Sequence, residues 1–449
     1  MTSKIVVNNI ESDSGISSVT FTSDIELGTK NLKGHNLEST GIVTAVSFTG
    51  SGANLTNLPA ANITGTLPAI SAANLTNVPA ANITGTLPAI DGSALTGVGA
   101  SFGNSSVNTS GIVTATAFVS TEQGSASFRN LVHNGNMYIN QRGTTSSTST
   151  GHITCDRWRT WHYAHGATCT TSISDVASGT NPYQEGHRKA YKFAMSGSAS
   201  AAAASSVFMA HSIEAQTMAQ CGWDFKSTTS FITVQFWVKA SHAQSYTATT
   251  MTPDSTGHLN YGWEFALAAN TWTKIIKTIP GHSNLAFNND ANNGLDLYIY
   301  AWIGDNYDNI TSADSWIVYD GDEYSLPISS GWLLSSSPTF EVTGVQIEVG
   351  KVATSYEHRS PVTELQLCQR YYHQTQGRMS WMTNVNATDH HKPIQFPVTM
   401  RTSPSVSFYD LSVDGSGANA QNVTPDGYAC RLQGNGRHAS WQHKAAAEI

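Results

Sequence analysis

The sequence is poor in charged residues. Of its 449 residues, 23 are Lys or Arg and 31 are Asp or Glu, giving a net charge of −8 and a charged fraction of 12%, about half the usual share for a soluble domain. The chain has no cluster of Lys and Arg that could neutralise phosphates, which argues against nucleic-acid binding. Its 5 cysteines lie far apart without a CxxC pair. They predict reduced thiols in a protein assembled in a cytosol.

Long apolar runs are also missing. The Ala- and Ser-rich stretch at 199–210 is the longest run of small apolar residues, and it is far shorter than the roughly 20 residues of a membrane-spanning helix. The opening MTSKIVVNN has no apolar core of signal-peptide length. We therefore expect no secretory leader and no membrane insertion. The sequence also lacks HExxH and P-loop motifs, so neither catalysis nor a cofactor is expected.

The composition changes sharply along the chain. Between Ser39 and Thr121 the only charged residue is Asp91, and this stretch has no Trp or Tyr. All 11 Trp and all 16 Tyr lie at or beyond Tyr138. Such a shift indicates two architectures in one chain. The first, charge-poor segment has too few large side chains to be an ordinary globular domain.

The charge-poor segment contains a repeat of twenty residues. Residues 54–73 read NLTNLPAANITGTLPAISAA and residues 74–93 read NLTNVPAANITGTLPAIDGS. Repeats of this length are typical of fibrous or solenoid proteins, and the regularly spaced prolines exclude a long helix. Because one chain has too few aliphatic residues to offset the entropy of ordering, two structures remain: several chains sharing a narrow apolar axis, or a flexible linker.

A second motif flanks the repeat. GIVTAVSF at 41–48 and GIVTATAF at 111–118 are rich in β-branched residues and open on glycine, which predicts two strands that begin and end the shaft. Residues 1–38 hold most of the early charges and form a separate head in this interpretation.

The remainder of the chain predicts an all-β fold. Segments with alternating apolar residues are separated by clusters of Gly, Asn, Ser and Asp, which indicates an antiparallel β-sandwich. The predicted strands lie in 128–143, 155–163, 231–241, 270–281, 295–304 and 340–350.

One helix follows the sandwich. Ser360 is suited to the N-cap, Pro361 to the first helical position and Glu364 to the first turn. Val362, Leu365 and Tyr372 are expected on one apolar face of this helix. Beyond it, PIQFPVTM, SVSFYDLSV and YACRLQ predict short strands, so residues 378–449 make a small terminal β-domain.

These motifs carry a resemblance. The NLTNLPAANITGTLPA repeats and GIVTA motifs, the run NLVHNGNMYINQRG with DRW, the run GVQIEVGKVATSYEHRSPVTELQLCQRYY and the closing KAAAEI are similar to tail fibres of tailed bacteriophages, especially those infecting cyanobacteria. The resemblance implies an elongated homotrimeric fibre of the virion, synthesised and assembled in the host cytoplasm. It also implies a jelly-roll-like, carbohydrate-binding-like sandwich, with tail or baseplate proteins bound through the N-terminus.

The expected organisation is a virion-attachment head at 1–38, a repeat shaft at 39–126, a sandwich module at 127–360, and a short helix with a β tip at 361–449. The expected function is adhesion to a host polysaccharide or lipopolysaccharide without catalysis. Two alternatives stay open: a structural appendage of the virion without receptor contact, and a polysaccharide depolymerase.

Four aromatic residues are the predicted ligand contacts: Trp161, Tyr163, Trp381 and His390. Rigid rings with a polar edge suit the flat faces and hydroxyl groups of sugars. Trp158, in the DRW motif, is expected in the core instead. For Trp381, burial on a terminal strand is an equally good interpretation.

Two polar clusters have less specific patterns. The carboxylates between Asp305 and Glu323 fit a solvated loop, a calcium site or, least well, an acid/base pair, since a glycosidase needs two carboxyls facing each other. Asp389, His390 and His391 fit a solvated loop better than a metal site, because no second spaced pair of ligands accompanies them.

Overall fold

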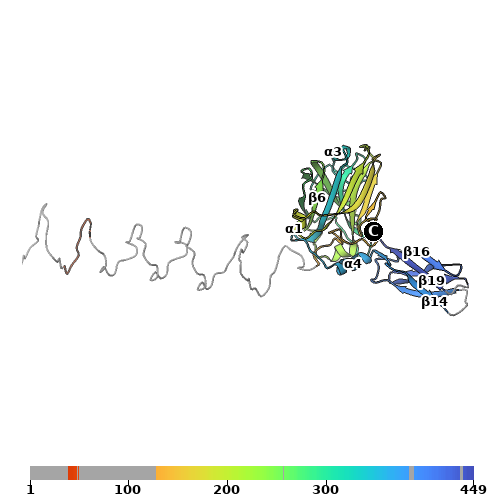
Figure 1. Ribbon diagram of the computed structural model, residues 1–449. Helices are drawn as coiled ribbons and strands as arrows, with labels where there is room; N and C mark the ends of the chain where they lie inside the picture. The colour runs from red at the N-terminus through yellow and green to blue at the C-terminus, as the bar shows by residue number, and fades with distance from the viewer. Residues whose placement is uncertain (1–38, 48, 50–127, 256, 384–388, 435–437) are drawn as a thin grey trace, which may run out of the picture. The chain divides into compact units, whose positions relative to one another are not determined.

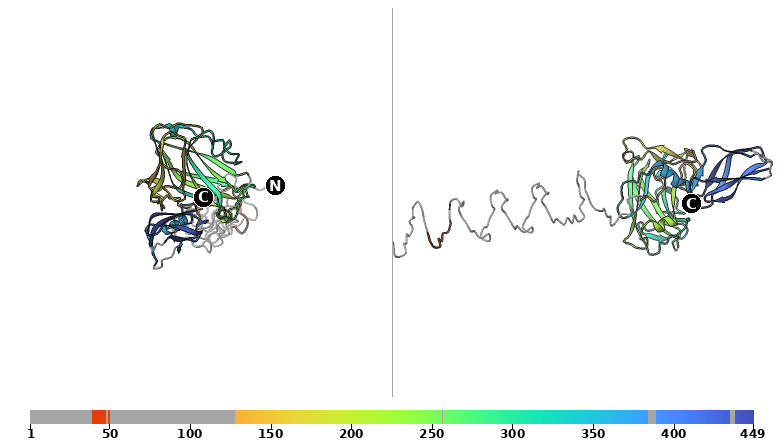
Figure 2. Two further views of the ribbon diagram at one scale, coloured as in Figure 1. Left: turned by 90° about the vertical axis from the view of Figure 1, so that its right-hand side faces the viewer. Right: turned by 90° about the horizontal axis from the view of Figure 1, so that it is seen from below.

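The fold is taken from a computed structural model, which describes residues 39–47, 49, 128–255, 257–383, 389–434 and 438–449. The chain divides into two compact units, Met1–Thr109 and Ser110–Ile449. Figures 1 and 2 show the second unit, in which two facing sheets form a sandwich and further strands form a smaller β tip.

The described part of the first unit contains no strand. Residues 41–47 of the first GIVTA motif have no ladder partner, and Ile42 and Val43 are exposed. The prediction of a strand in this motif is therefore wrong for the single chain, because an extended segment forms a β-strand only when a second segment pairs with it. The second GIVTA motif, the twenty-residue repeats and the head at 1–38 lie outside the described residues.

The first sheet of the sandwich has six antiparallel strands and is built around its last strand in sequence. β12, predicted at 340–350, lies between β4 and β6 and pairs with both. In spatial order the sheet contains β1 (Ser146–Ser147), β3 (Thr168–Asp175), β4 (Lys189–Ser196), β12 (Thr339–Val349), β6 (Phe231–Ala240) and β9 (Thr273–Pro280).

The second sheet also has six antiparallel strands, with β10 at its centre. In spatial order it contains β11 (Trp316–Val318), β8 (Leu259–Leu267), β7 (Gln244–Thr252), β10 (Asn293–Ile303), β5 (Ser206–Glu214) and β2 (Arg159–Tyr163). The strands predicted at 231–241, 270–281 and 295–304 are thus confirmed as β6, β9 and β10. Their alternation places aliphatic residues inward on both sheets.

The core fills the space between these sheets. Phe236 of β6, Ile299 of β10 and Phe340 of β12 are fully buried in it. Trp158 is also fully buried, as predicted, and its indole N–H donates to the carbonyl oxygen of Asn134 at 2.9 Å.

The segment 128–143 was predicted as a strand, and this prediction is wrong. Its backbone turns at Asn134 and Met137, which have φ values of 57° and 59°. The Asn134 side chain makes the hydrogen bonds that a ladder would otherwise supply. Its Oδ1 accepts from the backbone N–H groups of Tyr138 and Ile139 at 2.9 and 2.8 Å, and its Nδ2 donates to the carbonyl of Asp156 at 2.9 Å. An asparagine tolerates this left-handed conformation better than most residues.

Four helices occur in the described residues, three of them short: α1 (Asn181–Gln184), α2 (Ala215–Gln220) and α3 (Gly331–Leu334). The fourth, α4 (Pro361–Gln369), begins as predicted: Ser360 is the N-cap, its hydroxyl accepts from the Thr363 N–H, and Pro361 opens the first turn.

The predicted apolar face of α4 is wrong. The helix ends at Gln369, so Tyr372 lies beyond it, and Val362 is exposed. The buried positions are Glu364 and Cys368. The Glu364 carboxylate accepts a hydrogen bond from the Asn134 N–H, and burial raises the pKa of this carboxyl. The helix therefore docks through a buried acceptor rather than an apolar stripe.

The cap of α4 gives a first testable prediction. Replacing Ser360→Ala removes the acceptor for the Thr363 N–H, and we expect the free energy of unfolding to fall by about 1 kcal/mol in urea titrations. Ser330→Ala is the matched control, because Ser330 is the N-cap of α3 without a side-chain capping bond. Equal losses in the two variants would contradict a capping role for Ser360.

The tip consists of two smaller antiparallel sheets around a second core, which contains Phe396, Tyr428 and Trp441. In the first sheet, β13 (Tyr372–Gln374), β14 (Met379–Met382) and β16 (Ser405–Val413) all pair with β19 (His438–Ala446). The second sheet contains β15 (Asp389–Gln395), β18 (Gly427–Gln433) and β17 (Gly417–Thr424). SVSFYDLSV and YACRLQ are thus confirmed as strands.

A buried ion cluster ties the last residues of the chain to the sandwich. The Glu448 carboxylate accepts hydrogen bonds from Arg142 and Arg157, each at 2.9 Å, and Arg142 also donates to Asp156 at 2.8 Å. Arg157 is 1% exposed and Glu448 11%. Despite desolvation, the nearby His152 and the two arginines lower the pKa of Glu448 to about 2, whereas desolvation raises that of Asp156 to about 6.

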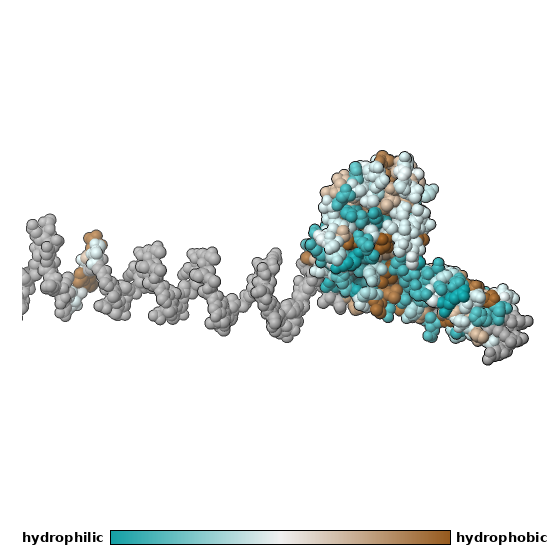
Figure 3. All heavy atoms as spheres, viewed as in Figure 1, coloured by the Kyte–Doolittle hydropathy of each residue, from teal (hydrophilic) through white to brown (hydrophobic). Residues whose placement is uncertain are grey.

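Hydrophilic side chains are unevenly distributed over the surface. On the face shown in Figure 3, residues near α3 have mostly intermediate hydropathy, and strongly hydrophilic side chains gather lower on the sandwich and along the tip. All five cysteines are free thiols. Among the described residues, no helix is long and apolar enough to cross a membrane.

Candidate functional site

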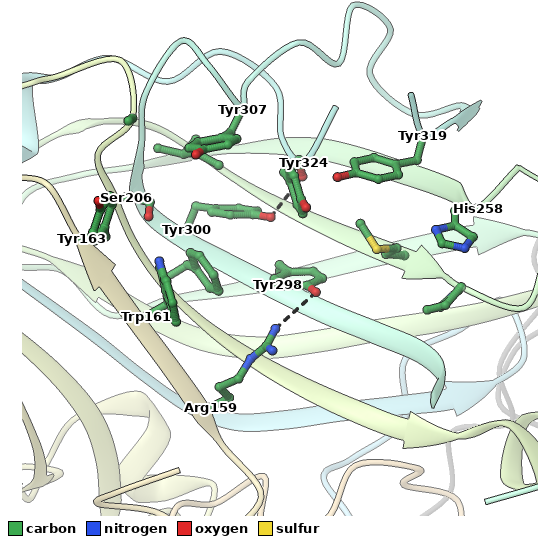
Figure 4. A pocket seen from close by; sticks show the side chains of 15 residues that line it. Arg159, Trp161, Tyr163, Ser206, His258, Tyr298, Tyr300, Tyr307, Tyr319 and Tyr324 are labelled. Atoms are coloured by element: carbon green, nitrogen blue, oxygen red, sulfur yellow. Dashed lines mark hydrogen bonds between the residues drawn. The ribbon is translucent and has the colours of Figure 1, made fainter. Parts of the chain in front are cut away.

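An aromatic cleft lies on the outer face of the second sheet, away from the core (Figure 4). The pairing of strands explains why aromatic residues meet there. Trp161 of β2 lies opposite Phe208 of β5, which lies opposite Tyr300 of β10. In the neighbouring row, Arg159 is aligned through Ala210 with Tyr298. Since residues two apart share a face, both rows point out of the sandwich.

The cleft has a volume of about 590 Å³, within the range of small-ligand sites. Strands of the second sheet form its floor, and the loops on either side of β11 supply part of its wall. It is lined by Arg159, Trp161, Tyr163, Ala204, Ser206, Phe208, Met251, Pro253, His258, Tyr298, Tyr300, Ile303, Tyr307, Tyr319 and Tyr324.

The rings on the floor pack against one another. The Phe208 ring lies 5.6 Å from that of Tyr298 and 5.4 Å from that of Tyr300, measured between centroids. Tyr298 and Tyr300 are stacked at 6.0 Å with an interplanar angle of 12°. Such contacts hold the floor rigid before any ligand arrives, which lowers the entropic cost of binding.

The rings of the wall form a second series. Tyr324 packs edge-on against both Tyr307 and Tyr319, with centroids 5.9 and 5.0 Å apart. The Tyr300 hydroxyl donates to the Tyr324 carbonyl oxygen at 3.1 Å, which joins the wall to the floor. The loops around β11 are thereby positioned over the sheet.

Three phenols of the cleft are held in their protonated form by burial. Burial raises the pKa of Tyr298, Tyr300 and Tyr319 above the ordinary value of a phenol. A protonated phenol is both a donor and an acceptor, so these groups match the hydroxyl groups of a sugar.

Trp161 and Tyr163, predicted as ligand contacts, both line this cleft. They are 42% and 58% exposed, in contrast to Trp158 in the same DRWRTWHY run. Trp158 precedes β2, and within β2 the exposed Trp161 and Tyr163 alternate with the less exposed Thr160 and His162. Whether the two residues touch a ligand stays a prediction.

The structure places Trp381 and His390 in the tip instead. They lie on β14 and β15, with ring centroids 6.0 Å apart at 90°. Trp381 is half-buried and packs against the tip core, and His390 is half-buried. The four predicted contacts thus fall into two separate pairs, of which only the first lines the cleft.

The carboxylate-rich stretch surrounds β11 and forms loops over the cleft, where Tyr307, Tyr319 and Tyr324 belong to the lining. Its carboxylates make local contacts: Asp314 pairs with Lys277, and Glu323 accepts from the Asp320 N–H at 2.6 Å. Within the described residues, no group of three or more His, Cys, Asp or Glu side chains is arranged to hold a metal ion.

Sequence reasoning missed most of the cleft, including Arg159, Phe208, Tyr298 and Tyr300. One signal was available. In LDLYIY, Leu and Ile alternate with Tyr298 and Tyr300, which places these two rings on the face opposite the core. The loop tyrosines had no such signal, because their position depends on how the loops fold back.

Comparisons with known proteins give only distant structural likeness. No protein-family model and no curated protein matches the sequence. The enzymatically active domain of tailspike protein 4 from bacteriophage CBA120 is similar with a TM-score of 0.26 and 8% identity, over 49% of this chain and 21% of that chain. This chain thus spans about a fifth of the tailspike chain.

Carbohydrate-binding modules also appear among the similar structures. A CBM4 module has a TM-score of 0.25 and 11% identity, over 49% of this chain and 99% of that chain. The family 11 module from Clostridium thermocellum, in complex with a mixed-linked tetrasaccharide, has a TM-score of 0.21 and 10% identity, over 47% and 99%. Likeness this distant carries no argument, so function has to be inferred from the cleft.

Proposed function

We propose that this protein is an adhesin of a phage tail fibre that binds a host-surface glycan in the aromatic cleft, without catalysis. The observation that carries the proposal is the cleft itself, where the exposed rings of Trp161 and Tyr163 stand beside a rigid floor of stacked tyrosines. Aromatic faces bind the apolar faces of sugar rings, and fixed polar groups nearby provide orientation.

The lining supports binding rather than hydrolysis. The side chains that line the cleft in the described part of the chain are aromatic, aliphatic and hydroxyl groups with one thioether, one guanidinium and one imidazole. Most glycoside hydrolases use a facing pair of carboxyl groups, and the cleft lining contains neither Asp nor Glu.

The fibre architecture is part of the same proposal. Its support is the resemblance of the repeats and of the run 344–372 to tail fibres, which are homotrimers. Residues 1–38 would attach the fibre to a tail or baseplate protein of the virion. Several clefts on one fibre would then act together, so that weak individual sites add up by avidity.

The replacement Trp161→Ala tests glycan binding directly. It removes an exposed ring from the cleft, and we expect binding to host cells or to their extracted surface polysaccharide to weaken by tenfold or more, because stacking and apolar contact are both lost. Since the ring is 42% exposed, the melting temperature should change little.

Tyr138→Ala is the matched control, because Tyr138 is 55% exposed and lies outside the cleft. It should bind as the unchanged protein does. Normal binding by the Trp161→Ala variant, or release of reducing sugar from the polysaccharide, would contradict the proposed function.

A further inference from the structure

We propose that the cleft selects an anionic glycan, and that Arg159 binds a carboxylate or sulfate group of the sugar chain. This inference rests on the proposed glycan-binding function and names the class of ligand for the same site. Arg159 lies in the cleft beside Trp161, so a sugar ring on the indole would bring its substituents to the guanidinium (Figure 4).

The first observation is that Arg159 uses few of its N–H donors within the described residues. A guanidinium carries five N–H donors, and within the described residues Arg159 makes one long hydrogen bond, 3.4 Å from Nη2 to the Tyr298 hydroxyl. Six other arginines bind carboxylate or carbonyl oxygens through two or more donors: Arg142, Arg157, Arg359, Arg370, Arg378 and Arg401.

The second observation is that the Arg159 side chain is held in place although no carboxylate pairs directly with its charge. Its partner Tyr298 donates in turn to Asp296 at 3.4 Å. The Asp296 carboxylate is 4% exposed and already accepts from the Ser212 hydroxyl and, at 2.7 Å, from the Asn293 amide. No ion pair within 4.0 Å joins Arg159 to a described carboxylate. The fork geometry of a guanidinium matches a carboxylate or sulfate oxygen pair.

The charges around the cleft also favour one orientation of the bound ligand. Figure 4 places Arg159 and Trp161 on one side, and Tyr307, Tyr324 and Tyr319 on the other. Glu323 and Asp322 follow Tyr319 closely in the chain, and they contribute to its raised pKa after burial and the neighbouring Tyr324. An anionic unit is therefore attracted at Arg159 and repelled near Tyr319, where a neutral sugar fits better.

The test uses an array in which each carboxylated or sulfated oligosaccharide is matched with a neutral counterpart, such as an oligogalacturonate with its methyl ester. The full-length protein is expected to bind acidic members about tenfold or more tightly than their neutral partners, and to lose this preference as salt rises. Comparison of the carboxylated with the sulfated oligosaccharides shows which anion Arg159 binds.

Arg159→Gln should abolish the preference but keep binding to neutral members through Trp161. Arg188→Gln is the matched control: it removes the same charge from an exposed arginine whose guanidinium donates to carbonyl oxygens outside the cleft. Equal binding of acidic and neutral members by the unchanged protein would overturn the anionic preference and leave the proposed function standing. Binding to no glycan of either kind would overturn both.

Discussion

Lowering the pH from 7 to 5 is expected to remove several kcal/mol from the free energy of unfolding, because buried histidines must stay neutral in the folded protein. Desolvation lowers the pKa of His152, His187 and His443 from 6.5 to about 4. Desolvation also lowers the pKa values of His211, which is buried, and of His133, which is half-buried, well below 6.5. The unfolded chain therefore takes up protons below pH 6.5 that the folded chain refuses, and stability is lost as the pH falls toward 4.

The size of the effect follows from these values. For a histidine with a pKa of about 4 when folded and 6.5 when unfolded, the loss at pH 5 is roughly 2 kcal/mol. Three such groups lose roughly 6 kcal/mol, comparable to the whole stability of a typical domain. Asp156 acts in the opposite direction, since its pKa is raised from 3.8 to about 6. It offsets only about 1 kcal/mol of the loss.

Urea unfolding at the two pH values measures the loss, and the uptake of protons on unfolding at pH 5 measures its cause. His152→Gln removes one of the buried groups and should flatten the pH dependence. His391→Gln replaces an exposed histidine and should leave it unchanged. A free energy of unfolding at pH 5 within about 1 kcal/mol of that at pH 7 would contradict the argument.

Replacing Glu448→Gln is expected to destabilise the protein by about 3–5 kcal/mol, the usual effect of removing one partner from a buried ion pair. The variant keeps the shape of the side chain but removes the charge that neutralises Arg142 and Arg157. Arg157 has no other described carboxylate in contact, because its second donor binds the Ser212 carbonyl. It would remain as a buried, uncompensated charge.

Asp410→Asn is the matched control, since it removes the carboxylate of an exposed pair with Arg378. Exposed ion pairs contribute little, so its urea midpoint should stay close to that of the unchanged protein. If the two variants lost equal stability, the buried cluster around Glu448 would not be the special contact that its geometry suggests.

Much of the sandwich could be predicted from local sequence patterns. The alternation in β6, β9 and β10 and the cap at Ser360 depend on residues close together in the chain, where periodicity and capping chemistry are specific. The segment 128–143 shows the limit of this approach. Its apolar residues imitate a strand, but Asn134 makes the backbone turn by accepting and donating hydrogen bonds that only the folded structure reveals.

The candidate site was harder to predict because it depends on pairing between distant strands. Trp161 and Tyr163 could be proposed from their residue type alone. Their association with Phe208 and Tyr300 requires the register of β2, β5 and β10, which no local pattern determines. The same holds for Arg159. Its unused N–H donors are recognised only when its hydrogen bonds in the folded structure are compared with those of the other arginines.

The central place of β12 also has a consequence for the order of events during synthesis. β4 and β6 emerge from the ribosome long before β12, yet neither is hydrogen-bonded to the other in the folded sheet. Until Thr339–Val349 arrives to separate them, each presents an unpaired apolar edge. Such long-range pairing makes folding slow and leaves intermediates prone to aggregation. The nascent chain must therefore keep these two edges apart for most of the time that the sandwich takes to be translated.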